Sequence, residues 1–285
     1  MPHHQAITES QMKQIPTGIN GLDKMLNGGL PANRCILICG SPGAGKTILG
    51  WQFLYYGAVK YNEPGLYVSL DEDIGQLKEE LKSFGCHFEK TETNEETSSL
   101  GWQIEQLEKE KKIAIVDASP IRRIPGKIKI GDLSIGKRDF SLLSLLTFVE
   151  RKVKDINAKR VVIDPITALT MQYNNISDRR TAILDLFESL NKLETTNLII
   201  TELRRVSLER EINTEEFLAH GVILLHAFVN NMEIVRSIQI EKMRGIAHDN
   251  QIRPYEITKK GVEVFPKEEP LIGTEATATA SQRWH

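Results

Sequence analysis

The chain of 285 residues contains only three cysteines, and no paired set of metal ligands accompanies them. Two of them, Cys35 and Cys39, fall in an apolar run, so we expect reduced core residues and no metal or disulfide role. No apolar run approaches the roughly 18 residues of a membrane-spanning helix. Residues 1–15 also lack the apolar core of a signal sequence. These absences lead us to expect a soluble cytoplasmic protein with no membrane partner.

Net charge is also small. The 36 Lys and Arg residues nearly balance the 38 Asp and Glu residues, which gives a formal net charge of −2. This value provides no general attraction to nucleic acid or to an anionic membrane. The hydrophobic fraction of 40% is enough for a sizeable core. Residues 1–15 are polar and residues 269–285 are small and polar, so we predict two flexible tails and one domain over residues 16–268.

The rest of the chain is organised around an apolar run that leads into a glycine-rich turn and then a helical pattern. Gly40, Gly45, Lys46 and Thr47 match the spacing G-x-x-x-x-G-K-[ST]. In such a P-loop the backbone N–H groups and the positive end of the helix face the phosphates. The lysine reaches the β- and γ-phosphates, and the threonine hydroxyl holds Mg²⁺. We therefore predict binding of ATP and Mg²⁺ by Ser41, Pro42, Gly43, Ala44, Gly45, Lys46, Thr47 and Ile48.

Strands and helices alternate beyond this loop. Apolar strands are predicted at residues 36–39, 66–70, 113–117, 160–164 and 197–201, with helices at 48–61, 74–84, 102–111, 141–157 and 178–194. This alternation predicts an α/β fold with a mostly parallel central sheet flanked by helices. Two strand pairs after residue 217, at 222–228 with 234–240 and at 255–257 with 262–265, predict a C-terminal antiparallel hairpin extension. Residues 120–140, which contain several Gly, Pro and basic residues, are predicted to form a loop.

P-loop enzymes require a carboxylate that holds Mg²⁺ directly or through water. Two aspartates, each at the end of a buried strand, are candidates for this role. We favour Asp164 over Asp117, because the strand before Asp164 is the more hydrophobic of the two. Asp117 is better suited to capping a turn with Ser119. The predicted metal site therefore consists of Thr47 and Asp164.

A third acidic group follows the strand at residues 66–70, at the edge where open α/β sheets place their ligands. Hydrolysis needs a group that orients or activates water near the γ-phosphate. We predict that Glu72 has this catalytic role and that Asp71 supports it. Helix capping is the structural alternative, and Asp73 before Ile74 suits it well. The two roles are compatible, with Asp73 capping the helix and Glu72 acting in catalysis.

A series of motifs runs in order along residues 16–266. The series comprises Thr17-Gly18-Ile19, Leu22-Asp23, Gly28-Gly29-Leu30-Pro31, the P-loop, Gln52-Phe53-Leu54-Tyr55, Leu70-Asp71-Glu72, Ser83-Phe84-Gly85, Asp117-Ala118-Ser119-Pro120, Asp164-Pro165-Ile166-Thr167, Thr201-Glu202, Glu215-Glu216-Phe217, Lys242-Met243-Arg244-Gly245 with His248, and Pro254-Tyr255-Glu256-Ile257-Thr258. In this series the chain resembles the KaiC-like family of RecA-superfamily ATPases. The P-loop is common to many NTPases, whereas the last two motifs are specific to this family.

The resemblance implies a RecA-like ATPase that forms a ring, usually of six subunits, with ATP between neighbours. It also implies that Lys242 and Arg244 reach the ATP of the adjacent subunit, where positive charge offsets the charge that develops in the transition state. Met243 would line the base or ribose pocket. Without the resemblance, Lys242 and Arg244 are interpreted as ordinary solvated charges. The remaining residues implied to line the same site are Ser83, His248 and Thr258.

Three departures from the family limit the resemblance. Glu216-Phe217 stands where the kinase half of the cyanobacterial clock protein has a phosphorylated Ser-Thr pair, so this domain is more similar to the hydrolysing half. Asp71-Glu72 replaces the usual two glutamates, and Asp is shorter by one methylene. Pro165 replaces the usual serine after the strand carboxylate.

Our leading hypothesis is an ATP-hydrolysing oligomeric switch whose nucleotide state is read by regulatory proteins not yet identified. A DNA-acting ATPase of the recombinase or helicase type is the main alternative, because basic residues could form a patch. This patch would comprise Arg122, Arg123, Lys127, Lys129, Lys137, Arg138, Arg204, Arg205 and Arg210. Few aromatic residues interleave with these, so nucleic acid is not favoured as a partner. A third hypothesis is an autokinase that phosphorylates its own Ser or Thr, for example within residues 274–281.

Overall fold

A computed structural model describes residues 12–82, 100–118, 127–130, 133–136, 142–173, 175–203, 214–230 and 232–269. Ser83, Ser119, residues 274–281 and most of the predicted basic patch lie outside these ranges, so the structure leaves the predictions made on them open. β1 (Gln14–Ile15) pairs antiparallel with β2 (Leu30–Pro31). The predicted N-terminal tail therefore overlaps a strand by two residues. Within the described ranges, no helix is both long and apolar enough to cross a membrane.

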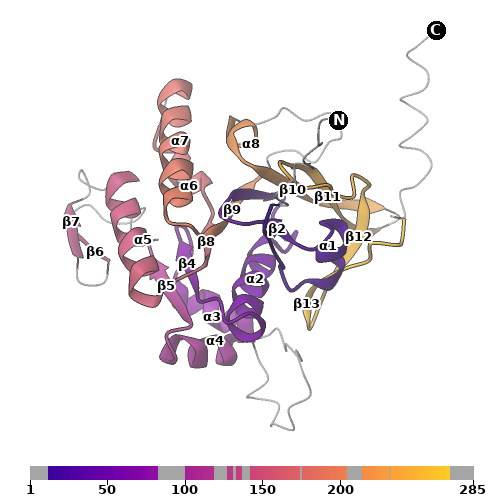
Figure 1. Cartoon of the computed structure of the whole chain (residues 1–285), viewed down its shortest axis with the longest axis horizontal. Helices are drawn as coiled ribbons and strands as arrows, with labels where there is room; N and C mark the ends of the chain where they lie inside the picture. Colours follow the sequence, from indigo (N-terminus) through magenta and orange to yellow (C-terminus); the bar gives the residue numbers. More distant parts are fainter. Residues whose placement is uncertain are drawn as a thin grey trace, which may run out of the picture.

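A nine-stranded sheet forms the centre of the fold, in the order β13-β12-β11-β10-β3-β9-β8-β4-β5 (Figure 1). Its parallel part consists of β3 (Cys35–Gly40), β9 (Thr196–Glu202), β8 (Arg160–Asp164), β4 (Gly65–Ser69) and β5 (Ile113–Asp117). Its other part consists of β10 (Gly221–Asn230), β11 (Glu233–Met243), β12 (Arg253–Thr258) and β13 (Gly261–Val264). β10 runs parallel to β3, and the last four strands pair antiparallel with one another. The predicted parallel sheet with an antiparallel C-terminal extension is confirmed.

Helices cover both faces of the sheet, and the central strand β3 is apolar on both faces. Its side chains alternate between two cores: Cys35, Leu37 and Cys39 face one, and Ile36 and Ile38 face the other. The first core is closed by α5 (Leu142–Ile156), α6 (Thr167–Thr170) and α7 (Ile176–Lys192); the second is closed by α1 (Asn20–Met25), α2 (Lys46–Lys60), α3 (Ile74–Lys82) and α4 (Leu100–Lys109). One further short helix, α8 (Thr214–Leu218), precedes β10.

The cysteines in β3 are core residues, as predicted. Cys35 and Cys39 are both buried, and neither forms a disulfide with another residue that the structure describes. Burial raises the pKa of the Cys35 thiol to about 12, so this thiol stays protonated and unreactive at neutral pH.

The prediction of a loop over residues 120–140 is wrong for residues 127–130 and 133–136, which form strands. β6 (Lys127–Ile130) and β7 (Leu133–Gly136) pair antiparallel as a separate two-stranded sheet, with Ile130 opposite Leu133. The glycines and prolines in this stretch favoured a loop. The alternation of basic and apolar residues in Lys-Ile-Lys-Ile is a strand pattern, and it determines the local structure here.

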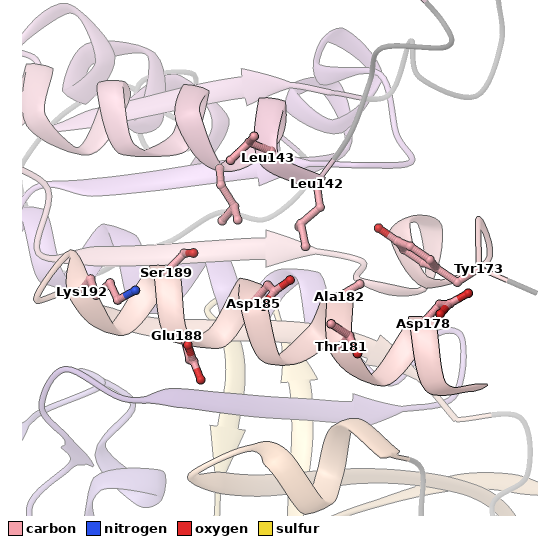
Figure 2. Close-up of a pocket in the computed structure, with 11 residues that line it drawn as sticks. Leu142, Leu143, Tyr173, Asp178, Thr181, Ala182, Asp185, Glu188, Ser189 and Lys192 are labelled. Carbon is pink, nitrogen blue, oxygen red and sulfur yellow. The ribbon is translucent and has the colours of Figure 1, made fainter. Parts of the chain in front are cut away.

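A groove of about 530 Å³ lies between α5 and α7 (Figure 2). Leu142 and Leu146 contribute apolar surface from α5, while Asp178, Asp185 and Glu188 line it from α7. In Figure 2, Leu142 extends from α5 toward α7. Three carboxylates along one wall repel phosphate groups, so this groove is a poor nucleotide site.

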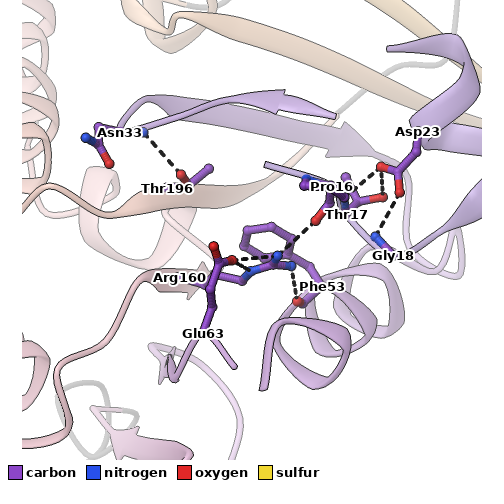
Figure 3. A network of polar contacts seen from close by, with 9 residues as sticks. All are labelled: Pro16, Thr17, Gly18, Asp23, Asn33, Phe53, Glu63, Arg160 and Thr196. Atoms are coloured by element: carbon purple, nitrogen blue, oxygen red, sulfur yellow. Dashed lines mark hydrogen bonds and ion pairs between the residues drawn. The ribbon is translucent and has the colours of Figure 1, made fainter. Parts of the chain in front are cut away.

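A buried arginine fastens the start of the domain to the sheet (Figure 3). The Arg160 side chain is fully buried, and its guanidinium donates to the carboxylate of Glu63 at 2.7–2.8 Å. It also donates to the main-chain oxygens of Phe53 and Pro16, each at 2.9 Å. Gly57 leaves the required space, since a Cβ there would lie 2.4 Å from Arg160 Cδ. The guanidinium therefore links β8 to α2 and to the N-terminal segment.

We expect Arg160→Met to lower the free energy of unfolding by about 3 kcal/mol, because it leaves a carboxylate and two carbonyl groups without their donor. Chemical denaturation followed by circular dichroism measures this change. The matched control is Lys154→Ala, which removes an exposed ion pair with Glu150 and is expected to cost less than about 1 kcal/mol. Equal effects of the two substitutions would contradict the role given to Arg160.

Candidate nucleotide site

The loop after β3 has the backbone that a phosphate cradle requires. Gly43 and Gly45 have positive φ values of 75° and 81°, a region that glycine adopts without steric cost. A Cβ at Gly45 would also lie 2.8 Å from Ile257 Cδ1. The Lys46 ammonium donates to the carbonyl oxygens of Gly40 at 3.0 Å and Ser41 at 2.9 Å. The lysine thus lies against the loop that precedes it, and α2 begins at this residue.

The structure brings Thr47 and Asp164 together from α2 and the end of β8. Thr47 Oγ1 donates to Asp164 Oδ2 at 2.7 Å. Burial raises the pKa of the Asp164 carboxyl above its ordinary value, while bonds from Thr47 and Tyr67 and the charge of Lys46 oppose that shift. By contrast, Asp117 ends β5, the edge strand of the sheet, four strands from β3.

This pair of oxygen donors suits Mg²⁺. The cation favours carboxylate and hydroxyl oxygens, and it commonly uses one or two protein ligands together with nucleotide phosphates. The residues that the structure describes contain no cluster of three or more His, Cys, Asp or Glu side chains that could hold a metal by itself. Thr47 and Asp164 would therefore hold the ion jointly with the phosphates.

The acidic segment after β4 places Asp73 at the start of α3 and Glu72 beside the P-loop. Asp73 Oδ1 accepts the Gln76 N–H at 3.2 Å, so Asp73 caps α3. Glu72 lines the pocket beside the P-loop, and its main-chain oxygen accepts the Ser69 hydroxyl at 2.7 Å. Burial raises the pKa of the Glu72 carboxyl, with further contributions from the negative charges of Asp164, Glu80 and Asp71. Asp71 is half-buried next to it.

The P-loop and Glu72 line one pocket of about 430 Å³. The pocket is also lined by residues that were not predicted to belong to the site, namely Leu77, Glu80, Leu81, Arg236 and Ile257. Arg236 Nε is buried and has no hydrogen-bond partner among the described residues. A cationic side chain in a pocket lined by P-loop residues suits an anionic ligand. No sequence signal identified Arg236, because its place depends on the register of β11.

The antiparallel extension holds the P-loop in place through hydrogen bonds to the loop and to α2. The buried hydroxyl of Tyr255, on β12, donates to the main-chain oxygen of Ala44 at 2.7 Å. Gln52, on α2, donates to the oxygens of Lys260 and Val262 and accepts from the Val262 N–H. These bonds tie the loop and its helix to the β12–β13 hairpin.

Lys242, Met243 and Arg244 do not reach this pocket within one chain. Lys242 pairs with Val222, which lies beside Leu37 near the start of β3. The P-loop follows Gly40 at the other end of that strand. The Lys242 ammonium donates to the Glu216 oxygen at 2.6 Å, and Arg244 donates to the Phe217 oxygen at 3.3 Å. Both cations therefore lie against the end of α8.

The other residues implied by the family resemblance are placed in different surroundings. Met243 is 5% exposed and packs against Gly221 in the core. The His248 ring lies within 3.2 Å of the Asp249 oxygen. The Thr258 hydroxyl donates to Glu263 at 2.8 Å within the β12–β13 hairpin, one residue after the pocket-lining Ile257. Arg244 is exposed and Lys242 and His248 are partly exposed, whereas Met243 is not available to a ligand in this conformation.

Comparisons with known proteins agree along most of the chain. A family model described as "ATPase: KaiC" matches residues 15–98 and 91–269. A UPF0273 protein of Thermotoga maritima is 33% identical over 259 residues, which cover 90% of this chain and 98% of that protein. The crystal structure of a KaiC-like protein from Pyrococcus horikoshii aligns with a TM-score of 0.70 and 33% identity, covering 90% of this chain and all of the other.

The clock proteins are longer relatives. The circadian clock oscillator protein KaiC of a Picosynechococcus strain is 32% identical over 256 residues, which cover 90% of this chain and 45% of that protein. The chain thus spans about half the length of the clock proteins that it matches, and nearly the full length of the UPF0273 proteins.

Proposed function

This chain belongs to the KaiC family of ATPases, and from that premise we propose that it hydrolyses ATP with Mg²⁺ in a homo-oligomeric ring and acts as a nucleotide-driven regulatory switch. The observation that carries the proposal is the 2.7 Å hydrogen bond that Asp164 accepts from Thr47, a residue that lines the P-loop pocket. It joins the two groups that P-loop enzymes use to hold a metal–nucleotide complex.

The binding step uses groups already in place. Backbone N–H groups of the P-loop and the N-terminus of α2 bind phosphate oxygens. Lys46 exchanges its bonds to two carbonyl oxygens for bonds to the phosphates. Bound Mg²⁺ would neutralise the β- and γ-phosphate oxygens, and the oxygens of Thr47 and Asp164 would hold it.

The hydrolytic step needs a base for water. Glu72 lies in the same pocket as Lys46 and Thr47, and its raised pKa makes its ionised form a stronger base than an ordinary glutamate. We assign Glu72 the role of orienting the attacking water and accepting its proton. Asp71 supports Glu72 through its negative charge.

The opposite placement of Lys242 and Arg244 supports a shared site. These cations lie near the start of β3, whereas the P-loop lies at its end. One chain therefore cannot bring its own P-loop and its own pair of cations to the same ATP without rearrangement. In a closed ring, each subunit presents one surface to the next in head-to-tail contacts. Lys242 and Arg244 would then act on the ATP of the adjacent subunit, and a ring of six is the proposed size.

A Lys46→Ala substitution tests the proposed nucleotide site. We expect it to weaken binding of a fluorescent ATP analogue in Mg²⁺ by about 10- to 100-fold, because charge-assisted hydrogen bonds to phosphate are lost. The matched control is Lys60→Ala, at the other end of the same helix, where the ammonium lies over the Tyr56 ring. Equal affinities of wild type and Lys46→Ala would refute the proposal.

A further inference from the structure

Tyr67 is a buried polar group to which the proposed chemistry assigns no role. It lies on β4 and is 1% exposed. Its hydroxyl donates to Asp164 Oδ2 at 2.8 Å. The same carboxylate oxygen accepts the Thr47 hydroxyl at 2.7 Å. One oxygen of Asp164 is thus held by two hydroxyl donors from two different elements.

The position of the Tyr67 hydroxyl is fixed from α2. Its ring stacks on that of Trp51, with 4.1 Å between centroids and 16° between planes. Trp51 lies one turn after Thr47 on α2. Contacts therefore run from Thr47 to Asp164, from Asp164 to Tyr67, and from Tyr67 to Trp51 on the helix that carries Thr47. Such a closed set of contacts restricts the rotation of the Asp164 carboxylate.

The other carboxylate oxygen is left for a different partner. Among the described residues, Asp164 Oδ1 accepts no hydrogen bond. The main-chain oxygen of Asp164 accepts the N–H of Leu70, the residue directly after β4, at 2.7 Å, and this bond also holds Asp164 in place. With Oδ2 occupied and the backbone fixed, Oδ1 has a defined direction.

We propose that Tyr67 is a positioning residue that orients Asp164 toward the Mg²⁺ ion bound with the nucleotide. The inference rests on the proposed ATPase function. Two donors on Oδ2 keep the carboxylate from turning, so that Oδ1 receives the ion or one of its waters without a cost in reorganisation. If Tyr67 only filled the core, its ring would contribute to packing, and its hydroxyl would have no effect on Mg²⁺ binding.

The test removes one oxygen atom. Tyr67→Phe keeps the ring and its stacking on Trp51 but loses the donor to Asp164. Tyr255→Phe is the matched control, because it removes another buried hydroxyl that bonds to the P-loop backbone at Ala44 and not to Asp164. The affinity of each protein for a fluorescent ADP analogue is measured with saturating Mg²⁺ and with EDTA, and thermal midpoints are recorded without nucleotide.

We expect Tyr67→Phe to lower the affinity on the order of tenfold in Mg²⁺ and to leave it unchanged in EDTA, with partial recovery as Mg²⁺ is raised. Tyr255→Phe is expected to lower affinity equally in both conditions. If Tyr67→Phe matches wild type, or weakens binding equally with and without Mg²⁺, the positioning role is overturned. If wild type itself gains no affinity from Mg²⁺, the proposed function fails, and the inference fails with it.

Discussion

A Glu72→Gln variant is expected to bind ATP and Mg²⁺ as the wild type does and to release phosphate about 10²- to 10³-fold more slowly. The amide keeps the shape of the side chain but cannot accept a proton from water. Binding is preserved because the phosphates are held by Lys46 and the P-loop backbone. The measurement pairs phosphate release with the affinity for an ATP analogue.

The control for this variant is Asp73→Asn, one residue further along. Asp73 caps α3 through its bond to the Gln76 N–H, and Asn caps helices equally well. We expect near wild-type turnover from Asp73→Asn. Comparable losses in the two variants would show that the segment matters for folding and that Glu72 is not the base.

The pH profile gives the same residue a second test. Because Glu72 must be ionised to accept a proton, turnover is full above its folded pKa and falls as the pH drops through that value. Burial and neighbouring carboxylates raise this pKa from the ordinary 4.5, so the acid limb lies above pH 4.5. The residual activity of Glu72→Gln is expected to lack this limb. An unchanged acid limb in that variant would assign the titration to another group.

An Arg244→Ala variant is expected to assemble normally and to lose turnover about 10³-fold or more, the range known for arginines supplied in trans to phosphoryl transfer. Arg244 is exposed, and among the residues that the structure describes its side chain makes a single hydrogen bond, 3.3 Å long, to the Phe217 oxygen. Truncation therefore removes little packing. Light scattering with Mg-ATP and phosphate release on the same samples check both parts of the expectation.

Arg151→Ala serves as the control, because Arg151 is an exposed arginine on α5 that takes no part in the proposed site. It should assemble and hydrolyse as the wild type does. A wild-type protein that hydrolyses ATP as a monomer, with or without Arg244, would show that the site is complete within one chain.

The parts of the site that the sequence predicted are those with local patterns. The P-loop is eight consecutive residues with fixed spacing, and the Asp164 strand is an apolar run that ends in a carboxylate. The alternation of strands and helices then predicted that both would meet at the same edge of a parallel sheet. Capping of α3 by Asp73 followed from a residue type next to a helical pattern. These features need only neighbours in the chain.

The features that were missed depend on residues far apart in sequence. Tyr67 lies 97 positions from Asp164, and Tyr255 lies 211 positions from Ala44. A tyrosine within an apolar strand is ordinarily a core residue, so neither hydroxyl could be assigned a partner before the sheet order was known. Arg236 likewise enters the pocket through the register of β11 with β10. The hairpin of β6 and β7 was missed for a different reason, because breaker residues outweighed a short alternating pattern.

Mixing two inactive variants tests most directly whether each ATP site is built from two subunits. Lys46→Ala lacks a working P-loop and Arg244→Ala lacks the residue that acts in trans. In a randomly mixed ring, about a quarter of the interfaces pair an intact P-loop with an intact Arg244. We expect each variant alone to be inactive and an equal mixture to regain about that share of wild-type phosphate release. An inactive mixture, in oligomers shown by native mass spectrometry to contain both variants, would show that Arg244 does not act on the ATP of a neighbouring subunit.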